Sequence, residues 1–141
     1  MTWRDALKGQ LQRHEGYRRV PYRCSAGKLT IGFGRNLEDR GIAPAEALYL
    51  LDADVDVTVS ELDRAMPWWA RLSHVRRLVL ADMHYNLGLE KLRGFRRMLA
   101  ALQSGNYEKA SDEMLDSKWA RHDVPRRAAR LAQMMRTNEI A

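Results

Sequence analysis

Three side chains near the start of the chain, Glu15, Cys24 and Thr30, have the types and spacing of a hydrolytic site. Hydrolysis of a glycosidic bond needs a carboxylic acid that protonates the leaving oxygen, and an opposing group that activates water or attacks the sugar carbon. Glu15 supplies a candidate acid, and Cys24 stands where an aspartate or glutamate is usual. The hydroxyl of Thr30 is able to hold the attacking water or to orient its neighbour. The pattern predicts cleavage of glycosidic bonds with a thiol in place of one carboxylate.

The surroundings of these groups decide their protonation. Glu15 is expected at a helix end beneath a hairpin, where partial desolvation raises the pKa of a carboxyl group. A cysteine thiol has a reference pKa of about 8.5, so only a few per cent is thiolate at pH 7. Cations close in sequence lower that pKa, whereas an ionised Glu15 opposes them; the candidates are Arg18, Arg19, Arg23 and Lys28. Cys24 is therefore a candidate base or nucleophile, and both roles stay open.

A helix and a hairpin are predicted to position the three residues. Residues 2–14 show a helical spacing of apolar residues, preceded by a capping pattern of Thr2 with Asp5, which places Glu15 at the helix end. Gly16 lets the chain turn away. Residues 29–33 alternate like a short strand after a turn at residues 25–28, so Cys24 and Thr30 are expected to flank that turn.

The remainder of the chain is predicted to be helical. Pro44 opens a long helix that runs to about residue 64, and Ser73 caps the next helix. Further helices are expected at 94–103, 107–116 and 124–136. The fold class is therefore α+β and mainly helical, with a small β-hairpin lobe and a helical lobe joined by a long helix. We expect one domain over 1–141, with the small lobe at 15–45 and the helical lobe at 65–141 together with the N-terminal helix.

Composition excludes several classes of protein. The chain has 141 residues and no apolar run long enough to span a membrane, and its start lacks the apolar core of a signal peptide. A single cysteine and four histidines without ligand spacing predict neither a metal nor another cofactor. The net charge of +6 resides in residues 66–141, which makes an acidic polymer a plausible partner.

The hairpin residues resemble the signature of phage-type lysozymes, glycoside hydrolase family 24. That signature is a glutamate, eight residues, an aspartate or cysteine, five residues and a threonine, which Glu15, Cys24 and Thr30 match. The stretch 30–34, Thr-Ile-Gly-Phe-Gly, matches as well. Residues further along resemble the family's linking helix and helical lobe, over 41–55, 75–95 and 117–128.

The resemblance implies a fold and an activity. The family cleaves the β-1,4 bond between N-acetylmuramic acid and N-acetylglucosamine, with Glu15 as general acid, Cys24 as base or nucleophile and Thr30 positioning water. Two substrate-binding residues are implied: Tyr85 lines the sugar groove, and Arg127 matches an arginine that pairs with the catalytic glutamate. The chain departs from the best-known member at Cys24 and at Arg35, which replaces a histidine, and its segment between Asn36 and Pro44 is short.

These observations give a leading hypothesis and two alternatives. The leading one is a monomeric phage endolysin that acts on bacterial peptidoglycan, made in the host cytoplasm and released to the periplasm and wall through a holin. The first alternative is a catalytically degenerate, cationic protein that binds the wall or permeabilises membranes. The basic C-terminal helix would serve it by contacting anionic outer-membrane lipid. Nucleic-acid binding through the basic half is the other alternative, and no recognition motif favours it.

Overall fold

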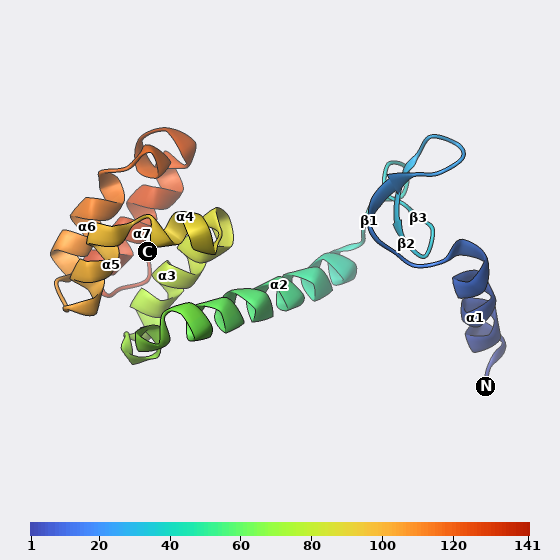
Figure 1. The fold of residues 1–141 in the computed structure, drawn as a ribbon, viewed down its shortest axis with the longest axis horizontal. Helices are drawn as coiled ribbons and strands as arrows, with labels where there is room; N and C mark the ends of the chain where they lie inside the picture. The colour runs from blue at the N-terminus through green and yellow to red at the C-terminus, as the bar shows by residue number, and fades with distance from the viewer. The chain divides into compact units, whose positions relative to one another are not determined.

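The computed structural model describes residues 1–141, which form two compact units, Met1–Leu50 and Leu51–Ala141. Figure 1 shows the three strands in the first unit and the helices α3 to α7 in the second. Each unit is described by itself below. The fold is α+β and mainly helical with one small antiparallel sheet, which confirms the predicted fold class.

Helix α1 (Trp3–Glu15) begins and ends as its sequence predicts. The hydroxyl of Thr2 accepts the backbone N–H of Asp5 at 3.2 Å, and the Asp5 carboxylate accepts the N–H of Thr2 at 3.1 Å. Two of the free amides of the first turn are thereby satisfied. At the other end Gly16 has a φ of 71°, a left-handed conformation that glycine adopts without strain. The helix therefore stops directly after Glu15.

The sheet follows α1 and has the strand order β1-β2-β3, antiparallel throughout. Its strands are β1 (Arg18–Arg23), β2 (Leu29–Gly32) and β3 (Arg35–Asn36). Tyr22 of β1 pairs with Thr30 of β2, and Thr30 pairs in turn with Asn36 of β3. The threonine thus lies on the central strand, two residues along the sheet from the turn that begins at Cys24.

The N-terminal unit has almost no interior. Thr30 is its one buried residue, and every buried hydrophobic side chain of the protein lies at Leu62 or beyond. Large apolar side chains such as Trp3, Tyr17 and Phe33 are exposed. Because the burial of apolar surface supplies most of the favourable free energy of folding, this unit is held mainly by its backbone hydrogen bonds, caps and ion pairs.

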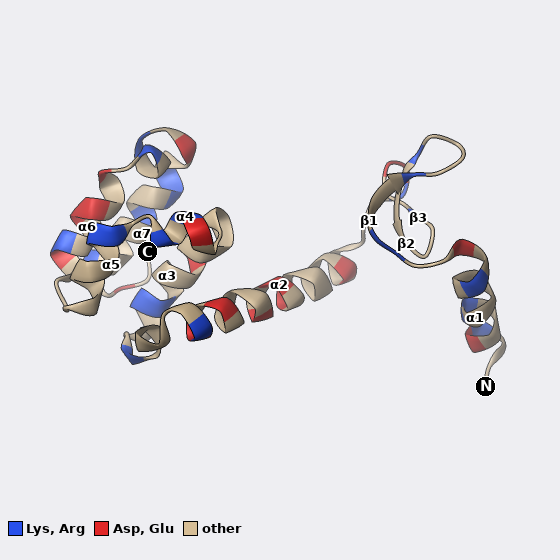
Figure 2. Cartoon of the chain, viewed as in Figure 1, with Lys and Arg blue, Asp and Glu red and all other residues tan.

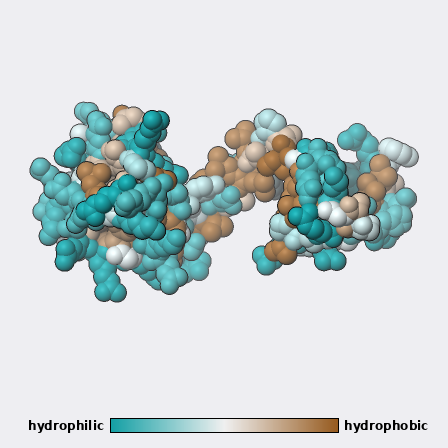
Figure 3. All heavy atoms as spheres, turned by 90° about the horizontal axis from the view of Figure 1, so that it is seen from above, coloured by the Kyte–Doolittle hydropathy of each residue, from teal (hydrophilic) through white to brown (hydrophobic).

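Helix α2 (Pro44–Ala65) starts in the first unit and ends in the second. Figure 2 shows acidic residues along its length, and the space-filling view in Figure 3 shows apolar surface over it. Among its large hydrophobic residues, Leu48, Tyr49 and Leu51 are exposed. Only Thr58 and Leu62, in the C-terminal half of the helix, are buried.

The second unit is a helical bundle with the protein's hydrophobic core. It contains η1 (Pro67–Arg71), α3 (His74–Leu87), α4 (Leu89–Arg93), α5 (Arg96–Gln103), α6 (Tyr107–Leu115), η2 (Trp119–Asp123) and α7 (Pro125–Thr137). The core is rich in leucine and methionine and includes Leu80, Met83, Met98, Met114 and Met135. No helix of the protein combines the length and the apolar character needed to cross a bilayer.

One polar contact is buried within this core. His84 of α3 is 4% exposed, and its Nδ1 lies 3.1 Å from the hydroxyl of Thr58 on α2. Its Nε2 has no hydrogen-bond partner and lies 3.5 Å from a carboxylate oxygen of Glu61. The threonine hydroxyl and the glutamate therefore fix where the second half of α2 meets α3.

Candidate functional site

The carboxylate of Glu15 lies against the backbone of Gly34, which follows β2. A Cβ atom built on Gly34 would be only 2.7 Å from Oε2 of Glu15, and the φ of Gly34 is 79°. Both the close approach and the left-handed backbone require glycine at this position. The sequence analysis quoted Gly34 within the matching stretch without giving it a role. Its contact with Glu15 arises from the way the chain folds back on the end of α1.

The side chain of Glu15 is exposed. We predicted that Glu15 is partly desolvated, but the N-terminal unit does not bury it, because this unit has almost no interior. No hydrogen bond joins Glu15 to Cys24 or to Thr30. The structure thus holds the candidate acid through the Gly34 contact and the helix end, separately from the other two residues.

Cys24 and Thr30 are brought together at the end of the hairpin. The turn is closed by two backbone bonds: the N–H of Cys24 donates to the carbonyl of Lys28 at 2.9 Å, and the N–H of Gly27 donates to the carbonyl of Cys24 at 2.8 Å. The pKa of the Cys24 thiol is lowered, chiefly by the backbone amide of Lys28 and next by that of Ala26, while burial opposes the shift. A smaller lowering comes from the hydroxyl of Thr30.

The predicted direction of the Cys24 shift agrees with the structure, but the predicted cause does not. The cations near Cys24 in sequence interact elsewhere: Arg23 forms an ion pair with Glu38 at 2.6 Å, and Lys28 forms one with Asp39 at 3.3 Å. Arg18 lies over the ring of Tyr22. Backbone N–H groups of the turn stabilise the thiolate instead. Side-chain charge is visible in a sequence, whereas amide direction depends on the turn conformation.

Thr30 is 3% exposed, and its hydroxyl donates to the carbonyl of Lys28 at 2.9 Å. A hydroxyl has one proton, so it serves one acceptor at a time. It bonds the carbonyl of Lys28, and it also lies close enough to Cys24 to lower the pKa of the thiol. Of the two roles suggested by the sequence, this burial favours orientation of the neighbouring thiol over contact with bulk water.

An ion pair next to Gly34 joins β3 to the start of α2. The guanidinium of Arg35 donates to the carboxylate of Glu46, through Nη1 at 3.1 Å and also through Nη2. Arg35 first, and then the N–H of Ala43, hold the pKa of Glu46 at about 2. The pair borders an apolar hollow of about 520 Å³ whose lining includes Ile31, Phe33, Leu37, Ile42 and Tyr49.

The two predicted substrate-binding residues lie in the helical unit, on α3 and α7. The hydroxyl of Tyr85 lies 3.4 Å from a carboxylate oxygen of Asp54, and Nε of Arg127 donates to Asp82 at 2.7 Å. Asp82 and Tyr85 are three residues apart on α3 and therefore share a face. The sequence analysis missed Asp82, although its spacing from Tyr85 was a usable signal. The predicted pairing of Arg127 with Glu15 joins residues of different units and stays a prediction.

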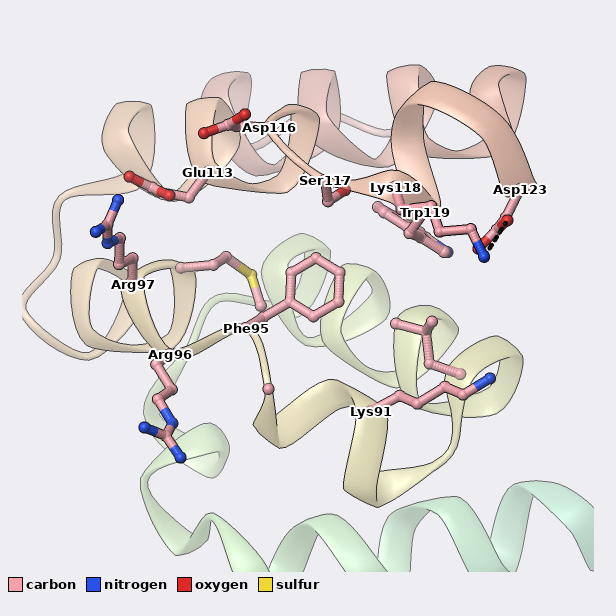
Figure 4. Close-up of a pocket in the computed structure, with 13 residues that line it drawn as sticks. Lys91, Phe95, Arg96, Arg97, Glu113, Asp116, Ser117, Lys118, Trp119 and Asp123 are labelled. Atoms are coloured by element: carbon pink, nitrogen blue, oxygen red, sulfur yellow. Dashed lines mark ion pairs between the residues drawn. The ribbon is translucent and has the colours of Figure 1, made fainter.

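A second hollow, of about 670 Å³, lies within the helical unit and contains none of the predicted site residues. Figure 4 shows Phe95 and Trp119 in it, with charged side chains from α4, α5 and α6 around them. The two rings meet edge to face with centroids 5.9 Å apart. Trp119 is buried and donates its indole N–H to Asn86 at 2.8 Å. These contacts make Trp119 part of the core. The structure contains no group of three or more acidic, histidine or cysteine side chains placed to hold a metal ion.

The lowered pKa of Cys24 predicts its reactivity. Iodoacetamide should alkylate Cys24 in the folded protein at a lower pH than it alkylates the same residue in the urea-unfolded chain, because the turn amides stabilise the thiolate only when folded. Mass spectrometry of samples quenched across pH 6 to 10 measures both rate profiles. A folded profile whose midpoint pH equals or exceeds that of the unfolded chain contradicts the turn as the cause.

Comparison with known proteins gives a consistent family. The sequence model described as phage lysozyme matches residues 12–136. A probable T4-type lysozyme 1 from Dictyostelium discoideum is 20% identical over 165 aligned positions, covering 96% of each chain. A protein named SAR-endolysin from Escherichia phage Mu is 30% identical over 103 positions, which cover 71% of this chain and 57% of that protein. The match to the family spans the hairpin, α2 and the helical bundle together. The chain belongs to the phage lysozyme family.

Proposed function

We propose that this phage lysozyme is an endolysin that hydrolyses the β-1,4 bond between N-acetylmuramic acid and N-acetylglucosamine in bacterial peptidoglycan. The proposal rests on the arrangement of side chains and backbone in the N-terminal unit. The unit seats a glutamate carboxylate on Gly34 and holds a thiolate-stabilising turn at Cys24, at the spacing of the family signature. Family membership supports a glycosidase of the lysozyme type and peptidoglycan as its substrate.

Glu15 acts as the general acid. It protonates the glycosidic oxygen as the bond to the anomeric carbon breaks. Because Glu15 is exposed in the free protein, the bound glycan has to supply the dry surroundings that favour a protonated carboxyl group. Gly34 lets the carboxylate lie directly against the backbone, because a side chain at 34 would occupy the same space.

Cys24 acts opposite Glu15, as the base that activates a water or as the nucleophile. Its thiolate is stabilised by two amides of the turn, so the pool of reactive anion at neutral pH is larger than for a free cysteine. Thr30 orients the sulfur through its hydroxyl. Positioning of the water by Thr30 itself remains the prediction drawn from the family.

Substrate and partner contacts follow the same reasoning. Tyr85, which is exposed, offers a ring face to a sugar, and Arg127 offers a cation to an anionic group. The enzyme would act as a monomer and reach the wall after release from the host cytoplasm through a holin. Contact of α7 with anionic outer-membrane lipid is a weaker proposal. Three of its four arginines already bond within the protein, to Asp82, Ala141 and Ser111.

Substitution Glu15→Gln should abolish lysis of outer-membrane-permeabilised Gram-negative cells. Removal of a general acid costs about 10²- to 10⁴-fold in rate, because the leaving oxygen then departs without a proton. Loss of turbidity is the measurement, with Glu90→Gln on the exposed surface of α4 as the matched control. Lysis by Glu15→Gln at the rate of the unchanged protein would show that the catalytic assignment is wrong.

The contact between Gly34 and the Glu15 carboxylate gives a second test. Gly34→Ala and Gly32→Ala both force an alanine into the left-handed region, at φ values of 79° and 70°, and each should lose about 1–2 kcal/mol of stability. A Cβ at 34 meets Glu15, whereas a Cβ at 32 meets nothing within 4 Å. Activity should therefore fall by about 100-fold in Gly34→Ala alone. Equal activities of the two variants would argue against the contact.

A further inference from the structure

Asp82 is the acidic side chain that the helical unit places on Arg127. Its Oδ1 accepts the Nε–H of Arg127 at 2.7 Å, and the two side chains are 39% and 41% exposed, so both reach solvent. The aspartate comes from α3 and the arginine from α7, two helices that pack against each other. An ion pair with this degree of exposure contributes little to stability. The ion pair instead acts on geometry, because it restricts the rotation of the long Arg127 side chain.

The bond uses only one of the five N–H donors of the guanidinium. Arg127 makes no other hydrogen bond within its unit, so the four Nη hydrogens remain for another acceptor. A planar guanidinium held through Nε offers its outer edge in a fixed plane, and that edge matches the two oxygens of a carboxylate. Tyr85 lies three residues from Asp82 on the same face of α3. The residue that holds Arg127 and the proposed sugar-binding residue therefore share one face of the helix.

We propose that Asp82 is a positioning residue, which holds Arg127 so that its free Nη edge binds a carboxylate during the reaction. The inference rests on the proposed function, because it takes Arg127 to be a binding residue. The carboxylate is one carried by the peptide-bearing wall polymer.

The test compares Asp82→Ala, Asp82→Asn and a matched control, Asp116→Ala, which removes the separate ion pair with Arg121. Asp82→Ala should lose about tenfold in kcat/KM on soluble peptidoglycan fragments, because a misplaced binding group costs about one to two orders of magnitude. Asp82→Asn keeps an oxygen for Nε and should recover most of the loss. Asp116→Ala should match the unchanged protein, and all three should keep its melting temperature.

The effect must also depend on Arg127. In an Arg127→Ala background, Asp82→Ala should cause no further loss, since a positioning residue has nothing left to position. The loss should appear as a rise in KM, because the carboxylate belongs to the bound polymer. A loss confined to kcat contradicts the inference.

Two further results overturn the inference: full activity of Asp82→Ala, or the same tenfold loss with and without Arg127. An assay of Glu15→Gln in parallel distinguishes failure of the inference on Asp82 from failure of the proposed function. If Glu15→Gln is inactive while Asp82→Ala is fully active, the inference fails and the hydrolase stands. If Glu15→Gln is fully active, the proposed function itself fails.

Discussion

The turn from Cys24 to Lys28 determines what the hairpin is able to do chemically. Its two closing bonds orient the amides of the turn, and the amides of Lys28 and Ala26 stabilise the negative charge on sulfur. A thiolate stabilised by backbone dipoles does not depend on neighbouring cations. This explains how the cations near Cys24 are free to form ion pairs with Glu38 and Asp39, which hold the hairpin to the segment after β3. The side chains of Arg23 and Lys28 thus hold the hairpin in place, whereas backbone amides lower the pKa of the Cys24 thiol.

The N-terminal unit is held by few apolar contacts, so its polar contacts carry unusual weight. The capping box of α1, the Arg35–Glu46 pair and the bonds of the turn are the interactions that define it. Each keeps one part of the unit in place: the start of the helix that ends at Glu15, the strand after Gly34, and the turn at Cys24. The helical unit is different, because a continuous core of leucine and methionine positions Asp82, Tyr85 and Arg127 on its surface.

Local signals made much of this structure predictable. The Thr2 and Asp5 cap, Gly16, Pro44 and Ser73 fixed helix ends within one or two residues, because each acts through bonds to its near neighbours. Short elements were missed: β3, α4, η1 and η2 have two to five residues and too few positions to show a period. At the site, residue types and spacing singled out Glu15, Cys24 and Thr30, whose catalytic roles stay predictions. The contact of Gly34 with Glu15, the pair of Asp82 with Arg127 and the source of thiolate stabilisation all depend on how distant segments or amide groups are oriented, which spacing does not encode.

The central claim is that the chain cuts the glycan of peptidoglycan on the reducing side of N-acetylmuramic acid. Purified Gram-negative sacculi, digested with the enzyme and then reduced with borohydride, report the bond cleaved through the sugar that carries the new reducing end. We predict reduced N-acetylmuramic acid in the soluble fragments, identified by mass spectrometry. Reduced N-acetylglucosamine, or soluble fragments without any new reducing end, would contradict the account.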